Sequence, residues 1–169
     1  IHGMCMAQET SVKNKKFGTI AIIGSGHMGS ALALGLARSG IPTKDIIVSG
    51  PSAMQNRALR KMGIQTIKNN REATEKAQWI FCAVKPALMT TVLEEIAPIT
   101  KGVLVLSLAA GVPLATLKKN APGARIARVM PNLPIAINKG VMEYFSRDLT
   151  KKEKGELVRL LSRLGVVVE

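Results

Sequence analysis

A chain of 169 residues with 47% hydrophobic side chains is long enough to bury both faces of a sheet within one domain, and its 3% aromatic content predicts an aliphatic core. No apolar run reaches the ~18 to 20 residues that a membrane span needs, so we expect no membrane partner. The net charge of +13 raises the question of nucleic acid. The lysines and arginines are scattered, however, and one tyrosine and one tryptophan form no stacking platform, so we expect no nucleic-acid partner.

Residues 1–16 lack the apolar centre of a secretory signal, and we expect a polar leader or an artificial remnant outside the fold. Cys5 lies in this segment and Cys82 in an expected strand. Two such cysteines provide neither a disulfide framework nor the spacing of a metal site. They favour a cytoplasmic protein without bound metal, in which Cys82 is an inert core residue.

Strand and helix patterns alternate along the rest of the chain. The expected strands are 19–23, 45–49, 64–67, 79–84, 103–108, 125–130, 141–145 and 166–168. The expected helices are 30–37, 53–62, 71–77, 87–96, 113–119 and 150–164. This alternation predicts an α/β fold: a doubly wound, mainly parallel Rossmann-type sheet with helices on both faces and right-handed crossovers.

The first strand and helix enclose a GxGxxG turn with the sequence Gly24-Ser25-Gly26-His27-Met28-Gly29. In a dinucleotide site Gly24 allows the tight turn, Gly26 lets a pyrophosphate approach the backbone, and Gly29 lets the helix pack closely on the strand. The helix N-terminus offers free N–H groups to the phosphates. Since strand, turn and helix follow one another, we expect a dinucleotide cofactor here.

The residues after the second strand bear on which cofactor is bound. An acidic residue at this strand end would bind the ribose hydroxyls of NAD and repel a 2′-phosphate. The sequence has Ser49-Gly50-Pro51-Ser52 there, and Asp45 falls at the beginning of the strand, at the other edge of the sheet. Because Arg57 in the next helix would also favour a phosphate, we expect NADP(H) to be preferred, with NAD(H) possible.

Several residues at the expected ligand edge have two interpretations. Asn70 either caps the helix that follows it or contacts the ligand, and Lys85, directly after a buried strand, either extends to solvent or contacts the ligand. The small side chains of Ala109 and Ala110 either let a flat ring lie against the backbone or only form a crowded turn.

Two further patterns concern the end of the chain. Pro131 and Pro134 are expected to stiffen a loop at the ligand edge. Thr150 and Glu153 have the spacing of a capping box and mark the start of the last helix.

Four segments together resemble pyrroline-5-carboxylate reductase. They are IIGSGHMGSAL (22–32), AVKP (83–86), LAAGVPLATL (108–117) and RVMPNLP (128–134). The resemblance covers residues 17–169 and implies that the chain supplies the NAD(P)H-binding domain of an enzyme that passes a hydride to the C=N carbon of a five-membered cyclic imine, giving proline.

The resemblance also implies cofactor contacts at individual positions. It places Ile23, Gly24, Ser25, Gly26, His27 and Met28 around the pyrophosphate. It places Ser49 and Gly50 near the adenosine ribose, and Ala109 and Ala110 near the nicotinamide. It places Asn70, Ala83, Val84, Lys85 and Pro86 along the cofactor. No catalytic side chain is assigned, since hydride transfer needs positioning more than acid or base chemistry, and His27 is poorly placed as a general base.

Two departures from the family pattern bear on the function. Leu133 stands where the family commonly has threonine, and the family's helical domain, which forms the dimer and much of the substrate pocket, would begin after Glu169. We therefore expect a cofactor domain over residues 17–169 of an enzyme that is a homo-oligomer at full length. The alternatives are a non-catalytic nucleotide-binding module, or a related reductase that uses a deazaflavin or another imine or carbonyl substrate.

Overall fold

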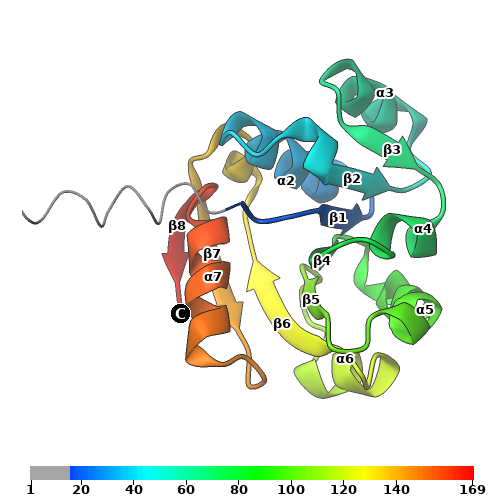
Figure 1. Cartoon of the computed structure of the whole chain (residues 1–169), viewed down its shortest axis with the longest axis vertical. Helices are drawn as coiled ribbons and strands as arrows, with labels where there is room; N and C mark the ends of the chain where they lie inside the picture. The colour runs from blue at the N-terminus through cyan, green and yellow to red at the C-terminus, as the bar shows by residue number, and fades with distance from the viewer. Residues whose placement is uncertain (1–15) are drawn as a thin grey trace, which may run out of the picture.

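The computed structural model describes residues 16–169, and most of the expected leader, with Cys5, lies outside them (Figure 1). The strands are β1 (Ile20–Ile23), β2 (Ile46–Ser49), β3 (Gln65–Ile67), β4 (Trp79–Cys82), β5 (Leu104–Ser107), β6 (Arg125–Met130), β7 (Gly140–Phe145) and β8 (Gly165–Val168). The α-helices are α2 (His27–Arg38), α3 (Ala53–Lys61), α4 (Asn70–Thr74), α5 (Pro86–Ile96), α6 (Leu114–Asn120) and α7 (Lys151–Leu161). Short 3₁₀ helices are η1 (Thr43–Asp45), η2 (Ala97–Ile99) and η3 (Leu133–Ile137).

The strands form one sheet in the order β3-β2-β1-β4-β5-β6-β7-β8. All pairs from β3 to β6 are parallel, β7 is antiparallel to β6, and β8 is parallel to β7. The chain winds outward from β1 to β3 in one direction and from β4 to β8 in the other. The neighbouring strands β1 and β4 therefore flank the topological switch point, where this class of sheet binds ligands.

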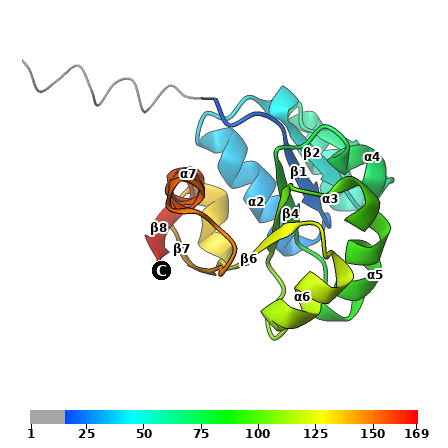
Figure 2. The same cartoon turned by 60° about the horizontal axis from the view of Figure 1, so that its bottom comes forward.

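Two aliphatic layers cover the sheet, one on each face. Figure 2 shows α2 and α7 on one side of the central strands and α5 and α6 on the other. The first layer joins α2 and α7 to the sheet through residues such as Leu32, Leu36 and Leu160, and the second joins α5 and α6 through Met89 and Leu117. This arrangement confirms the expected doubly wound fold, in which β1 and β4 are buried along their whole length.

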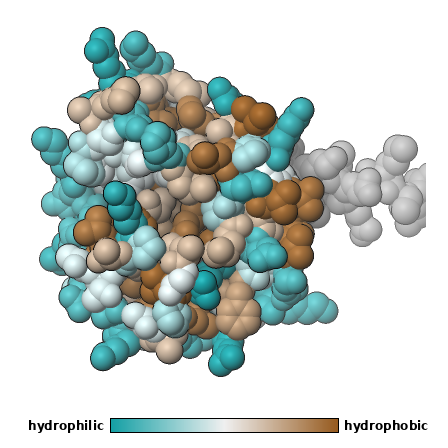
Figure 3. Space-filling view, turned by 180° about the vertical axis from the view of Figure 1, so that it is seen from behind, coloured by the Kyte–Doolittle hydropathy of each residue, from teal (hydrophilic) through white to brown (hydrophobic). Residues whose placement is uncertain are grey.

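The last two strands have one uncovered face. Alternate residues of β7 are buried and exposed, and the exposed apolar side chains on β7 and β8 are Val141, Phe145, Val166 and Val168. Figure 3 shows apolar side chains reaching the surface among hydrophilic ones on the rear side of the molecule.

The helices that the structure describes give no sign of a membrane span. Among residues 16–169, no helix is both long and apolar enough to cross a bilayer.

One local expectation is wrong. The helix expected at 71–77 begins at Asn70 and ends at Thr74, and Asn69 caps it by accepting a 3.0 Å hydrogen bond from the Glu72 amide. Asn70 therefore is not the cap. A loop does follow β6 at Pro131 and Asn132, and it leads into η3, which packs against α2.

Candidate functional site

The glycine turn lies at the carboxyl edge of the sheet and is held by backbone contacts on both sides. The Gly24 amide donates to the Ser49 carbonyl at 2.7 Å, and the Ala83 amide donates to the Ile23 carbonyl at 2.7 Å. Gly24 has a φ of +109°, and a Cβ there would lie 2.5 Å from the Ala83 carbonyl oxygen. A Cβ at Gly29 would lie 1.8 Å from the Gly24 carbonyl oxygen, so both glycines are required by packing.

Gly26 is different, because nothing lies within 4 Å of the position that its Cβ would occupy. It is the N-cap of the twelve-residue helix α2, with a φ of −72°, and no side chain of the described part of the chain caps this helix. The first turn therefore presents amide N–H groups beside open space, with the positive end of the helix dipole behind them. A pyrophosphate fits this arrangement, because its oxygens would accept from those amides where a side chain would otherwise stand.

Ser25 and the turn after β2 support the glycine turn. Ser25 is buried, its Oγ accepts a 3.2 Å hydrogen bond from the Ser52 amide, and its carbonyl accepts one from the Ser30 hydroxyl. The side chain thus braces the loop, while the exposed part of the motif is Gly26 and His27. Met28 is half-buried and packs against the core.

The end of β2 is joined to α4 and α5 by side-chain hydrogen bonds. The buried Ser49 hydroxyl donates to Asn70 Oδ1 at 2.7 Å, and Asn70 Nδ2 donates to Glu95 Oε2 at 2.9 Å. Gly50 follows directly, and its amide donates to the Ile67 carbonyl. The structure therefore brings Ser49, Gly50 and Asn70 together. Glu95 was missed, because it lies on α5 in no recognisable motif.

The ends of β4 and β5 continue the same edge. The Leu108 amide donates to the Cys82 carbonyl at 3.0 Å, which brings the segment after β5 beside Ala83 and Val84. Both of these residues are half-buried, whereas Lys85, the N-cap of α5, is exposed.

The remaining expected contacts lie on the two segments that follow these strands. Pro86 is exposed and begins α5. Ala109 is buried and its amide donates to Ser107 Oγ, while Ala110 is exposed.

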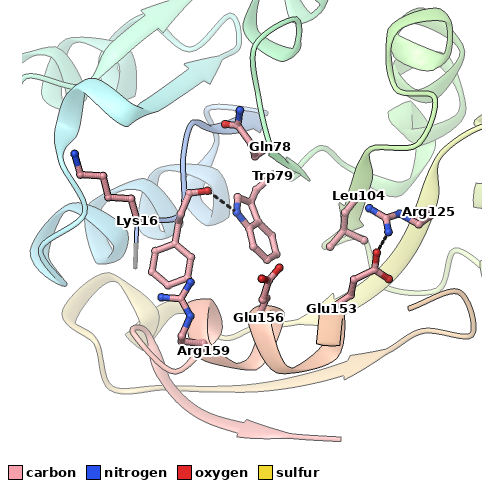
Figure 4. A pocket seen from close by; sticks show the side chains of 9 residues that line it. Lys16, Gln78, Trp79, Leu104, Arg125, Glu153, Glu156 and Arg159 are labelled. Atoms are coloured by element: carbon pink, nitrogen blue, oxygen red, sulfur yellow. Dashed lines mark hydrogen bonds and ion pairs between the residues drawn. The ribbon is translucent and has the colours of Figure 1, made fainter. Parts of the chain in front are cut away.

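A cavity of about 240 Å³ lies at the opposite, amino edge of the sheet and contains none of the expected site residues. Figure 4 shows it between the starts of the central strands and α7. The indole Nε1 of Trp79 donates to the Phe17 carbonyl at 3.0 Å, and the guanidinium of Arg159 lies 3.8 Å from the centre of the Phe17 ring. Arg125 forms an ion pair with Glu153 on its rim. These contacts tie residue 17 and α7 to the sheet.

A glycine turn at the switch point of a doubly wound sheet, leading into an uncapped helix, defines a Rossmann-type dinucleotide-binding domain. Residues 19–111 match the protein family described as "NADP oxidoreductase coenzyme F420-dependent". Because the match extends over more than half of the chain, the chain belongs to this family.

The relatives of this chain include pyrroline-5-carboxylate reductases. The chain is 38% identical to pyrroline-5-carboxylate reductase 3 of Bos taurus over 126 residues, which are 73% of this chain and 41% of that protein. The structure of a pyrroline-5-carboxylate reductase from Coxiella burnetii superposes with a TM-score of 0.84 at 29% identity, covering 90% of this chain and 58% of that one. The Plasmodium falciparum enzyme with NADP bound gives 0.82 at 26% identity, covering 92% and 58%.

These comparisons confirm the resemblance to the N-terminal domain of pyrroline-5-carboxylate reductase. The chain spans about half the length of the curated relatives it matches. The contacts of individual residues with a cofactor stay predictions.

Proposed function

We propose that this chain is the cofactor-binding domain of an NADPH-dependent reductase that converts 1-pyrroline-5-carboxylate to L-proline. The observation that carries the cofactor assignment is the open space at Gly26 beside the uncapped N-terminus of α2. The names of the relatives support the reaction, and the NADP bound in the Plasmodium falciparum structure supports the choice of cofactor.

Three groups of residues would hold the cofactor. The amides at Gly26 and the start of α2 would bind the pyrophosphate, Ser49, Gly50 and Asn70 would lie beside the adenosine ribose, and the segment from Ala83 to Pro86 would lie along the cofactor. The small side chains of Ala109 and Ala110, after the end of β5, would let a flat ring lie against the backbone. The nicotinamide, when bound, supplies the hydride. The protein's part is to hold and orient the reactants, which lowers the entropic part of the barrier.

The preference for the phosphorylated cofactor follows from charge. No carboxylate occupies the turn from Ser49 to Ser52, and Arg57 is exposed on α3, the helix that follows it. The residues of this turn would therefore not repel a 2′-phosphate, and the guanidinium could attract it.

The remaining assignments concern the whole enzyme. We propose a cytoplasmic homo-oligomer that binds a small-molecule substrate and no nucleic acid, with residues 17–169 as the cofactor domain and much of the substrate pocket provided by a further helical domain. The exposed apolar face of β7 and β8 supports association with another protein surface, since exposed apolar patches commonly mark interaction sites.

Gly26→Ala tests the cofactor site. The φ of Gly26 suits alanine and the added methyl group meets no atom, so the apo variant should melt close to the wild type. The methyl group would, however, stand where the pyrophosphate approaches. We expect NADPH affinity, measured by isothermal titration calorimetry, to fall by about tenfold or more, corresponding to ~1.4 kcal/mol or more. Unchanged affinity in a folded variant would overturn the site.

Turnover of pyrroline-5-carboxylate tests the reaction. Oxidation of NADPH with formation of proline by the 169-residue chain would support the proposal, and tight NADPH binding without turnover would support a cofactor domain that needs its other half. The second candidate is a deazaflavin-dependent reductase, which the description of the matching family favours. Binding of reduced coenzyme F420 in place of NADPH would establish it.

A further inference from the structure

A series of three hydrogen-bonding side chains connects the end of β2 to α5 by way of α4. Ser49 is completely buried, Asn70 is half-buried, and Glu95 is exposed. The Ser49 hydroxyl donates to Asn70 Oδ1 at 2.7 Å, and Asn70 Nδ2 donates to Glu95 Oε2 at 2.9 Å. The inner end of the series is thus fixed in the core, and its outer end is a carboxylate on the surface.

The chemistry of these groups fixes their direction. An ionised carboxylate only accepts hydrogen bonds, so the Asn70 amide must turn its nitrogen toward Glu95. Its oxygen then faces Ser49, and the Ser49 hydroxyl must donate. A hydroxyl both donates and accepts, so Ser49 alone would be satisfied by either orientation of the amide. Glu95 is therefore the group that selects one orientation.

The orientation matters because of where the amide lies. Asn70 is hydrogen-bonded to the last residue of β2, and the adenosine ribose of a dinucleotide lies at that strand end in this class of fold. With one N–H held by Glu95 and one lone pair held by Ser49, Asn70 keeps one donor and one acceptor for ribose hydroxyls. Reversing the amide would exchange the two.

We propose that Glu95 is a positioning residue of the cofactor site, which holds the Asn70 amide in the orientation that receives the adenosine ribose. This inference rests on the proposed cofactor function. It adds a residue of α5 that lies 25 positions along the chain from Asn70.

The test compares Glu95→Ala with Glu94→Ala. Glu94 is the preceding residue of the same helix, is also exposed, and loses the same charge when replaced, so it is a matched control. Binding of NADPH and of 2′-phospho-ADP-ribose, which lacks the nicotinamide, is measured by calorimetry. We expect Glu95→Ala to weaken both ligands by the same factor, about five- to tenfold, as for the loss of one ordered hydrogen bond. Glu94→Ala should stay within about twofold.

Two further variants separate positioning from a general structural effect. In an Asn70→Ala background, Glu95→Ala should cause no additional loss, because a residue that acts only through Asn70 has nothing left to orient. Glu95→Gln should lie between the wild type and Glu95→Ala, since the glutamine oxygen can still accept but no longer excludes the reversed amide. The melting temperatures of the apo proteins should follow those of the Glu94→Ala control.

These measurements distinguish failure of this inference from failure of the proposed function. A wild-type chain that binds neither ligand overturns the proposed function, and this inference with it. If the wild-type chain binds both ligands, two results would overturn the inference alone. The first is equal affinity of Glu95→Ala and Glu94→Ala for the ligands. The second is a loss of affinity from Glu95→Ala that is as large in the Asn70→Ala background as in the wild type.

Discussion

A Cβ at Gly50 would lie 2.4 Å from the Oγ of Ser25, so the turn after β2 rests directly on the glycine turn after β1. The 3.2 Å hydrogen bond from the Ser52 amide to the same Oγ closes this contact. The two turns that we assign to the pyrophosphate and the ribose are therefore mechanically coupled. A substitution that displaces one turn should therefore also displace the other.

Gly50→Ala should both destabilise the fold and weaken NADPH binding. The added methyl group would also lie 2.6 Å from the Ser25 backbone nitrogen, so the glycine turn must shift. Overpacking of this kind costs about 1–3 kcal/mol. Urea denaturation and calorimetry measure the two effects. The control is Gly155→Ala, whose Cβ meets nothing on the exposed face of α7 and which should gain about 0.5–1 kcal/mol. Wild-type affinity in Gly50→Ala would contradict the coupling.

Asn138 should be important for stability although it is not among the proposed cofactor contacts. It has a φ of +59°, and its Nδ2 donates to the carbonyls of Gly35 and Arg163, both at 2.8 Å. Asn138→Gly keeps the backbone conformation and loses the two bonds, for a cost of about 1–2 kcal/mol. Asn138→Ala should cost about 1 kcal/mol more, because alanine is strained in the left-handed region. Equal free energies of unfolding for the two variants in urea would show that backbone strain at residue 138 does not add to the cost.

The stability of the fold should fall at alkaline pH partly because of Cys82. Complete burial raises the pKa of its thiol from 9.0 to about 12. Between these values the unfolded chain loses the proton and the folded chain keeps it, so stability decreases as pH rises. One thiol contributes a slope of about 1.4 kcal/mol per pH unit. Cys82→Ala should show a shallower decline between pH 9 and 11 in urea titrations, whatever its stability at neutral pH. Parallel curves would show that Cys82 is not the cause.

Thr150→Ala should loosen the start of α7. The Thr150 hydroxyl accepts from the Glu153 amide at 3.2 Å, and the Glu153 carboxylate accepts from the Thr150 amide at 2.8 Å. Loss of the cap should cost about 1 kcal/mol in thermal or urea unfolding. Thr150→Ser keeps the oxygen and should stay near the wild type. If Thr150→Ser were as unstable as Thr150→Ala, the loss of stability would come from the missing methyl group and not from the missing cap.

The parallel half of the fold could be predicted because its strands are short apolar runs between amphipathic helices. The antiparallel direction of β7 was not predicted, because the alternating pattern of residues 141–145 does not indicate whether a strand runs parallel or antiparallel to its neighbour. A usable signal was the connection between β6 and β7, which holds only η3 and is short for a parallel crossover. The capping box at Thr150 and Glu153 was predicted and is confirmed, because its spacing is local.

The candidate site was predictable where local geometry dictates the residue type. The three glycines of the turn followed from spacing alone, and the capping role of Asn69 could have been found from Glu72 three positions later. The capping interpretation of Asn70, one of the two that we considered, was wrong by one residue. Glu95 could not be found, because its contact with Asn70 depends on how α4 and α5 pack.

Trp79 is the single tryptophan of the sequence, and it begins β4 at the edge opposite the glycine turn. Four residues of strand, about 13 Å, separate its position from the carboxyl edge. NADPH bound at the glycine turn would therefore dim its emission by energy transfer to the dihydronicotinamide without direct contact, and the emission maximum would stay fixed. A shift of the maximum would report that residue 17 or α7 had moved around the indole. One optical titration thus distinguishes simple occupancy of one edge from a rearrangement of the other.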